Sequence, residues 1–248
     1  MQQSIIKNSE SLPNEFREET PILDYSHLAI QNLIKERNWN FLDSVQKIKE
    51  IYNFVRDEIP FGYNEDDAIS ASKVLSDGYG QCNTKANLLM ALLRATGIPC
   101  RFQGFTIDKA LQKGAISGLW YKLAPQNIVH SWVEVQVNSE WFFLEGVILD
   151  KKYLQNLQNK FKNINGAFCG FGVYTSSLQN PVIDWDLNNT FIQDKGINQD
   201  FGTFSSPDEF YNIHSQKLGF IKKFAYKYFI RHRINKNVDK IRNTGVNA

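Results

Sequence analysis

The feature of this sequence that most constrains its fold is a change of hydrophobic period at Gly97-Ile98-Pro99. Residues 82–96 (CNTKANLLMALLRAT) carry apolar side chains at helical spacing, and the glycine and proline that follow are typical of a helix end. Residues 98–107 and 128–137 instead alternate apolar and polar side chains, which is the pattern of strands. This order predicts an α+β domain with helices packed on an antiparallel sheet.

Further elements extend the pattern on both sides. Helical stripes begin near Asp24 and Asp43, a short helix is expected at 71–77 (ASKVLSD), a strand at 141–147, and Asp150 is placed to cap another helix. Beyond residue 165 the period weakens, and no element is assigned. The chain is expected to divide into a flexible arm at 1–21, one domain at 22–211 and an extension at 212–248.

The composition is that of a folded chain. With 42% hydrophobic and 22% charged residues, 248 residues are enough for one large domain with a buried core. No apolar run approaches the roughly 20 residues of a membrane span, and residues 1–30 are too polar for a signal-peptide core. Three cysteines without a C-x-x-C spacing argue against a disulfide scaffold or a zinc cluster. We therefore expect a cytoplasmic protein with at least one free thiol.

The net charge of +2 conceals a basic C-terminal extension. Residues 212–248 hold nine of the 28 Lys and Arg and a single acidic residue, Asp239. Between residues 217 and 242 these cations are interleaved with apolar side chains, as in a helix with one apolar stripe. Three interpretations stay open: a helix packed on the core, a segment that binds an anionic membrane surface, or a site for an acidic partner. Because no recognition motif accompanies the charge, no specific nucleic acid is expected.

Two short motifs that could suggest ligand sites are weak. The acidic run Glu65-Asp66-Asp67 lacks the alternating ligands and the glycine of a calcium loop, so a solvated turn or a helix cap is the preferred interpretation. Gly78-x-Gly80 lacks the later glycine and lysine of a phosphate-binding loop. We therefore expect neither a metal nor a cofactor.

Cys82 stands at the first turn of the expected helix. Unpaired backbone N–H groups and the helix dipole favour an anion there, so the thiol is predicted to be biased towards the thiolate, which is the nucleophilic form. The alternative is a small buried residue without chemistry, because cysteine is among the most buried residue types. A nucleophilic cysteine also requires an imidazole within hydrogen-bond reach and a further group to orient that imidazole.

His130 is the best placed of the four histidines, because it begins a strand on the face opposite a row of valines. A two-residue loop at Asn138-Ser139 would set His130 opposite Val147 and Trp132 opposite Glu145. His130 and Glu145 would then be diagonal neighbours, at about 7 to 8 Å between their Cα atoms.

The length of that hairpin loop decides whether Glu145 can take part. A three-residue loop would turn Glu145 to the other face of the sheet. Asp150 and Asn127 are the reserve groups for orienting the imidazole.

Four segments of the chain together resemble a known family. They are Tyr79-Gly80-Gln81-Cys82, Leu92-Leu93-Arg94-Ala95-x-Gly97-Ile98-Pro99, His130-x-Trp132-x-Glu134 and Trp141-x-x-Leu144-Glu145. In combination, over about residues 45–160, they are similar to the transglutaminase-like superfamily. The resemblance implies a papain-like core in which Cys82 is the nucleophile and His130 the base. Glu145 stands at the acidic third position, where the family usually has an aspartate followed by a proline.

The resemblance also implies supporting residues and an activity. Animal transglutaminases contact the oxyanion with an upstream tryptophan, and the loop upstream of Cys82 offers Tyr63 instead. The backbone N–H of Cys82 is the other expected donor, with Gln81 and Trp132 as supporting residues. The expected reaction is acyl transfer through a thioester, with hydrolysis of a peptide or protein amide favoured because nothing indicates a second site for an amine. The alternatives are a transglutaminase that uses amine acceptors, or an inactive binding module that keeps the fold.

Overall fold

The computed structural model describes residues 14–215 and 219–244. The helices are α1 (Leu28–Glu36), α2 (Ser44–Asp57), α3 (Ala71–Asp77), α4 (Cys82–Ala95), α5 (Gly118–Leu123), α6 (Lys151–Lys160), α7 (Pro207–Ile213), α8 (Phe220–Ala225) and α9 (Arg231–Thr244). The strands are β1 (Cys100–Asp108), β2 (Asn127–Val137), β3 (Glu140–Phe143), β4 (Phe168–Gly170), β5 (Val173–Thr175) and β6 (Ile197–Phe204). Short 3₁₀ turns lie at Asn14–Phe16, Trp39–Phe41, Lys109–Gln112, Glu145–Val147 and Asp194–Gly196, and a π-helical turn, η6, spans Tyr226–Ile230.

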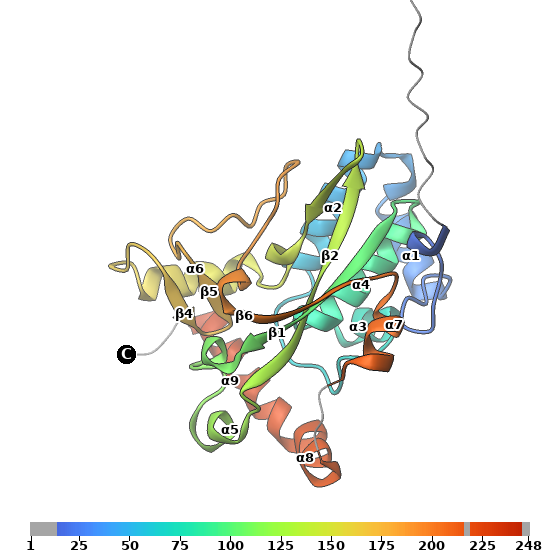
Figure 1. Cartoon of the computed structure of the whole chain (residues 1–248). Coiled ribbons are helices and arrows are strands. Elements are labelled where there is room, and N and C mark those ends of the chain that lie inside the picture. Colours follow the sequence, from blue (N-terminus) through green and yellow to red (C-terminus); the bar gives the residue numbers. More distant parts are fainter. Residues whose placement is uncertain (1–13, 216–218, 245–248) are drawn as a thin grey trace, which may run out of the picture.

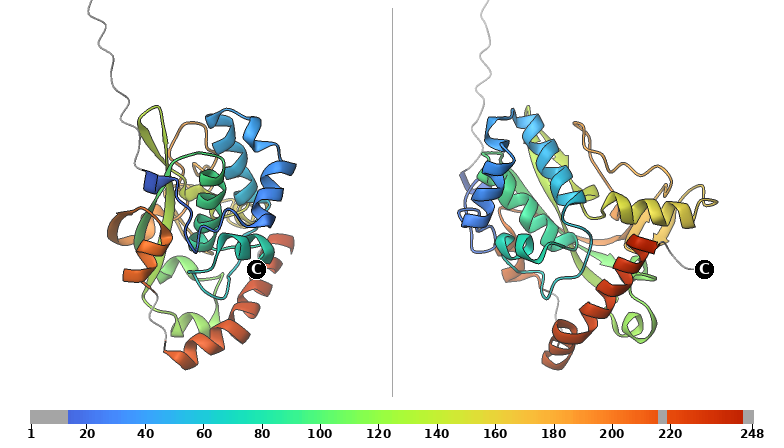
Figure 2. Two further views of the ribbon diagram at one scale, coloured as in Figure 1. Left: turned by 90° about the vertical axis from the view of Figure 1, so that its right-hand side faces the viewer. Right: turned by 180° about the vertical axis from the view of Figure 1, so that it is seen from behind.

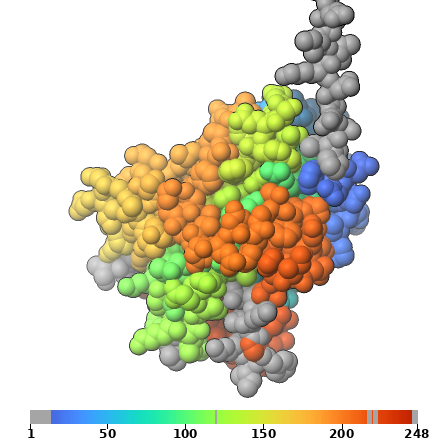
Figure 3. All heavy atoms as spheres, in the orientation of Figure 1, coloured from blue at the N-terminus to red at the C-terminus, as the bar shows by residue number. Residues whose placement is uncertain are grey.

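A four-stranded antiparallel sheet forms the centre of the molecule. Its strand order is β3-β2-β1-β6, and β4 and β5 form a separate hairpin. Helices α1 to α4 gather on one side of the sheet (Figure 1). The segment that contains β6 and α7, coloured orange, lies on the near surface (Figure 3). The predicted α+β class, with helices packed on an antiparallel sheet, is confirmed.

The core lies between α4 and the sheet. The valines of β2 at positions 129, 133, 135 and 137 are buried against it, as their alternation predicts. Helix α4 is buried over nearly its whole length, including the polar Lys85. The Lys85 ammonium donates to the carbonyls of Arg56 and Ile148, each at 3.0 Å, and burial lowers the pKa of Lys85 to about 7.

The predicted helices and the first two strands lie close to their predicted positions, whereas α5 is a helix that the sequence analysis does not predict. Helix α3 spans 71–77 as expected, α4 ends one residue before the predicted end, and Asp150 caps α6 through Tyr153 N–H. Asp43 caps α2, whereas α1 begins at Leu28 and is capped by His27 rather than Asp24. Strand β6 and helix α7 lie in the region for which no element was predicted.

The hairpin of β2 and β3 has the predicted two-residue loop. Asn138 and Ser139 both adopt positive φ, at 51° and 68°, and Val137 pairs with Glu140. The strand predicted at 141–147 is wrong at its end, because β3 stops at Phe143 and a 3₁₀ turn begins at Glu145.

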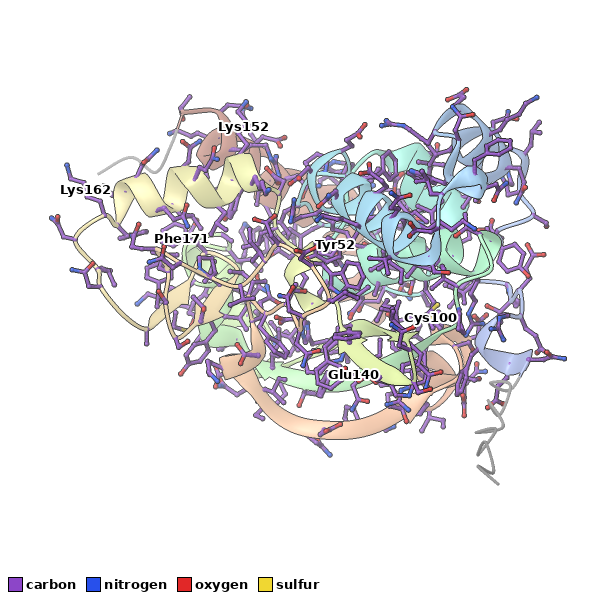
Figure 4. All side chains as sticks on the ribbon, turned by 90° about the horizontal axis from the view of Figure 1, so that it is seen from above. Tyr52, Cys100, Glu140, Lys152, Lys162 and Phe171 are labelled. Atoms are coloured by element: carbon purple, nitrogen blue, oxygen red, sulfur yellow. The ribbon has the colours of Figure 1, made fainter. Side chains whose placement is uncertain are left out.

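Gly146 allows the chain to turn there. A Cβ atom at this position would lie 2.7 Å from the Tyr52 hydroxyl, which itself donates to the carbonyl of Ile183 at 2.7 Å. Tyr52 lies in the interior of the molecule (Figure 4). The turn therefore depends on a close approach that glycine permits.

The described part of the expected arm packs on the domain. The carbonyl of Glu18 accepts a hydrogen bond from Arg94 at 2.7 Å, and the Thr20 hydroxyl donates to Asp208. Residues 1–13 of that arm, and residues 216–218 and 245–248 of the extension, lie outside the described residues.

The extension is helical and packs on the domain through α9, which contacts α6 and crosses the back of the molecule (Figure 2). Ile234, Val238 and Ile241 are its buried side chains. Arg242 is also buried and contacts the Asp150 carboxylate at 3.0 Å. Among the described residues, no helix is both long and apolar enough for a membrane crossing.

Gly104 of β1 is a position where the packing admits no larger residue. A Cβ atom there would lie 2.2 Å from the Phe210 ring of α7. Gly104→Ala is therefore expected to lower the free energy of unfolding by about 1 to 3 kcal/mol, because the ring must move out of a packed core. Urea denaturation measures this. Gly219→Ala, with no described atom within 4 Å of the new Cβ, is the matched control, and an equal effect of both substitutions would contradict the packing argument.

Candidate active site

Cys82 is the first residue of α4, and the loop before it is held in place by backbone pairing. Gly62 N–H donates to the Gly80 carbonyl at 3.0 Å, and Gly80 N–H donates to the Pro60 carbonyl at 3.1 Å. Gln81 N–H donates to Thr84 Oγ1 at 3.0 Å, which anchors the N-terminus of the helix. The N–H groups of the first helical turn have no carbonyl partner within the helix, so they are available to an anion at Cys82.

The start of α4 meets the edge of β2 that β3 leaves uncovered. Leu144 N–H donates to the Val133 carbonyl at 2.9 Å, so alternate residues of β2, including Ser131 and Val129, direct their backbone groups to this edge. Asn83 Nδ2 donates to the Val129 carbonyl at 3.0 Å, and the Ser131 hydroxyl donates to Asn83 Oδ1 at 2.9 Å.

These contacts place the sulfur beside the strand that carries His130. The backbone N–H of Ser131 is directed at the Cys82 sulfur, and so is that of Asn83. Asn83, the residue after Cys82, therefore forms hydrogen bonds with Val129 and Ser131, which precede and follow His130 in β2. The helix start and the histidine are brought together by this junction, although they lie far apart in the sequence.

His130 and Glu145 meet in the interior. His130 Nε2 lies 3.3 Å from Glu145 Oε1, and both side chains are fully buried. The Glu145 carboxylate accepts Ile192 N–H at 2.5 Å and Gln193 N–H at 2.9 Å, so its position is set by the backbone. Neither imidazole nitrogen forms a hydrogen bond with a described residue; Nε2 faces the Glu145 carboxylate, so Nδ1 is the nitrogen left for a substrate or a thiol.

Aromatic side chains enclose the imidazole on the side of the sheet away from α4. Phe105 lies opposite His130 in the register, with ring centroids 6.2 Å apart. Trp132 packs on Phe105 at 4.1 Å and donates through Nε1 to Glu134 at 3.2 Å. Trp132, predicted as a supporting residue, is therefore part of the apolar wall beside His130.

The electrostatics of Cys82 differ from the sequence prediction. Burial raises the pKa of the Cys82 thiol, and the carboxylates of Asp67 and Glu145 raise it further. The backbone N–H groups of Asn83 and Ser131 lower the pKa of this thiol, but their effect is smaller than that of burial. The predicted bias towards the thiolate does not hold in this structure, because Cys82 is only 9% exposed and loss of water outweighs the effect of the helix start.

The two other supporting residues have partners of their own. The Tyr63 hydroxyl donates to the side chain of Gln112, and Tyr63 is buried. Gln81 accepts Asn64 N–H at 2.9 Å and donates to Asp67 at 2.7 Å. Gln81 therefore ties the upstream loop to the helix start, and a role for Tyr63 at an oxyanion stays a prediction.

The reserve orienting groups lie elsewhere. Asp150 accepts Phe61 N–H at 3.0 Å and pairs with Arg242, and Asn127 is exposed and accepts from Asn198 at 2.9 Å. Glu145 is the acid that the structure places against His130.

Sequence reasoning missed Asn83, Ser131 and Asp67. Asn83 and Ser131 form the junction described above, and Asp67 is the carboxylate with the largest effect on the Cys82 thiol. The sequence contains one indication of these contacts. Four consecutive polar or small residues, Asn83 to Ala86, lie in the first turns of a helix whose later residues are mostly apolar. Buried polar side chains require partners, so they indicate contacts beyond the helix.

Two carboxylates of the acidic loop pair with lysines, and among the described residues no group of three or more His, Cys, Asp or Glu side chains is arranged to hold a metal ion. Glu65 pairs with Lys227 at 2.9 Å and Asp66 with Lys223 at 2.6 Å. Glu65 and Asp66 of this predicted turn stay partly exposed and also contact the C-terminal extension. All three cysteines are free, and of these Cys169 is the exposed one.

Comparison with known proteins finds a matching family model and similar solved structures. Residues 35–146 match the family model of the transglutaminase-like superfamily. One similar solved structure, a proposed cysteine protease from Cytophaga hutchinsonii, is 13% identical with a TM-score of 0.44; the match covers 78% of this chain and 47% of that one. Another, red sea bream transglutaminase, is 20% identical with a TM-score of 0.29; the match covers 50% of this chain and 25% of that one. Among curated proteins, none matches this chain.

The chain thus spans less than half the length of either solved neighbour. The family match runs from the end of α1 to the turn after β3 and includes Cys82, His130 and Glu145. The fold agrees with the family match, which shows a segment similar to the transglutaminase-like superfamily over residues 35–146 of this chain.

Proposed function

We propose that this protein is a cysteine-dependent hydrolase that cleaves amide bonds in peptides or proteins through a thioester. The observation that carries the proposal is the contact of 3.3 Å between His130 Nε2 and Glu145 Oε1, on a strand that the start of the Cys82 helix contacts through Asn83. A buried histidine that faces a carboxylate with one nitrogen keeps the other for proton transfer. The thiol then needs only to reach that second nitrogen.

The first half of the reaction forms the thioester. His130 Nδ1 takes the proton from Cys82, and the sulfur attacks the carbonyl carbon of the amide. The backbone N–H of Cys82 donates to the oxyanion that develops, since it lies at the start of α4. The imidazolium then gives its proton to the amine, which leaves as the C–N bond breaks.

The second half regenerates the enzyme. His130 takes a proton from water, the hydroxide attacks the thioester, and the carboxylic acid leaves as the thiol is re-formed. Glu145 keeps the imidazole aligned in both halves, and its own position is set by the N–H groups of Ile192 and Gln193. Water is favoured over an amine as the acceptor because water is present at high concentration, whereas an amine needs a binding site of its own beside the thioester.

Removal of the thiol is the first test. Cys82→Ala is expected to reduce cleavage of a mixed peptide library to background, and His130→Ala to reduce it at least about a hundredfold, because proton transfer is lost. Mass spectrometry of the products measures this, and circular dichroism checks the fold. Cys169→Ser, a change at an exposed thiol, is the matched control and should keep full activity. Undiminished cleavage by Cys82→Ala would exclude the mechanism.

Glu145→Gln tests the orienting role. The substitution keeps the shape of the side chain but removes the charge that faces His130 Nε2, so kcat is expected to fall about a hundredfold with little change in KM. Glu145→Asp, which restores the charge on a shorter stem, should recover part of the rate. A larger change in KM than in kcat, or no recovery with aspartate, would show that Glu145 serves the fold rather than the imidazole.

Alkylation with iodoacetamide reports the state of each thiol. In the free protein we expect Cys169 to react first, Cys82 more slowly and the fully buried Cys100 last, with peptide mapping as the measurement. Because burial raises the pKa of Cys82, its protonated form persists past the ordinary thiol range, and its rate should keep rising as the pH increases through that range. Fastest labelling of Cys82 at neutral pH would contradict the raised pKa.

A further inference from the structure

The C-terminal extension presents a second set of apolar side chains that the domain does not cover. In α9 the apolar residues point inward, whereas Phe224, Tyr228 and Phe229 of α8 and η6 are exposed, by 52%, 51% and 63%. Phe224 and Tyr228 lie against each other, with ring centroids 4.7 Å apart. The sequence predicts one apolar stripe in the extension, whereas the structure has two sets of apolar side chains. One set packs on the domain, and the other is exposed to solvent.

The helical segment that carries this outward aromatic cluster is basic, although Lys223 and Lys227 pair with Asp66 and Glu65 of the domain. The helical segment 220–244 holds eight Lys and Arg and a single acid, Asp239. Arg233 and Lys236 are exposed and form no ion pair with any described residue. Lys227 lies over the Tyr228 ring at 5.7 Å, so cationic and aromatic groups share one surface.

The shape of the segment decides between possible partners. Helix α8 projects at one end of the molecule in both Figures 1 and 2, and α5, which ends at the half-exposed Leu123, lies towards the same end. A projecting helix with apolar rings and cations suits a flat anionic surface, where rings enter the headgroup boundary and cations contact phosphates. A single-stranded nucleic acid would instead be held in a basic groove.

We propose that the outward aromatic cluster and the surrounding cations form a docking surface for an anionic phospholipid membrane. The apolar rings supply the insertion, and Arg233 and Lys236, which lack carboxylate partners among the described residues, supply the electrostatic attraction. The inward stripe of α9 keeps the segment attached to the domain meanwhile. This proposal does not depend on the hydrolase activity.

The experiment is sedimentation of the full chain with phospholipid vesicles. Binding is expected to vesicles of equal parts phosphatidylcholine and phosphatidylglycerol at low ionic strength, to weaken steeply with salt, and to be absent with phosphatidylcholine alone. Phe224→Ser and Phe229→Ser should each weaken binding about tenfold. Arg233→Gln and Lys236→Gln should each weaken it about fivefold.

Matched controls distinguish binding through this surface from nonspecific binding to the vesicles. Phe41→Ser removes a ring that is 88% exposed on a different helix, and Lys162→Gln removes a cation that points away from α6 (Figure 4). Neither should change binding, and Cys82→Ala should bind like the parent chain. The proposal is overturned if anionic vesicles are not bound at low salt, if the controls weaken binding as much as the cluster variants, or if a single-stranded RNA binds through the same residues while the vesicles do not.

Discussion

The structure depends on the junction between the start of α4 and the uncovered edge of β2. A strand edge carries backbone groups that require partners, and a helix start carries N–H groups that require acceptors. Asn83 joins the two, because its amide donates to the Val129 carbonyl and accepts from the Ser131 hydroxyl. The geometry needed to satisfy these groups is also the geometry that places Cys82 beside the strand that carries His130.

The early end of β3 makes this junction possible. If the strand continued, Glu145 would pair with β2 and its neighbours would occupy the edge that α4 now meets. The chain instead turns at Glu145-Gly146, and the carboxylate is held by Ile192 and Gln193 N–H groups. A buried carboxylate is costly without such donors, so the irregular stretch after β5 is a structural requirement of the site as much as a connection to β6.

The sequence predicts local elements well here and their junctions poorly. Helix α4 and the hairpin register follow from periodicity and from the Asn138-Ser139 turn, which are short-range signals. The two-residue loop predicts that His130 and Glu145 are neighbours, and the structure places them in contact. Glu145 reaches this position from a 3₁₀ turn, because β3 ends before it. The contacts of Ile192, Gln193 and Asp67 depend on chain segments distant in sequence and without a period, so no local pattern indicates them. The predicted bias of Cys82 towards the thiolate is wrong for the same reason. The pKa of the thiol is raised by burial, which depends on the assembled fold.

The C-terminal extension shows how a helical pattern can serve two faces. Positions 226, 230, 234 and 238 recur every four residues and pack towards the domain, in part or completely. Phe224, Tyr228 and Phe229 lie off that line, and they cluster where the π-helical turn interrupts the α-helical period. Packing on the core and exposure of a basic aromatic surface, which compete as interpretations of the sequence, therefore use different residues. The ion pairs of Lys223 with Asp66 and of Lys227 with Glu65 connect this end of the extension to the loop before α3.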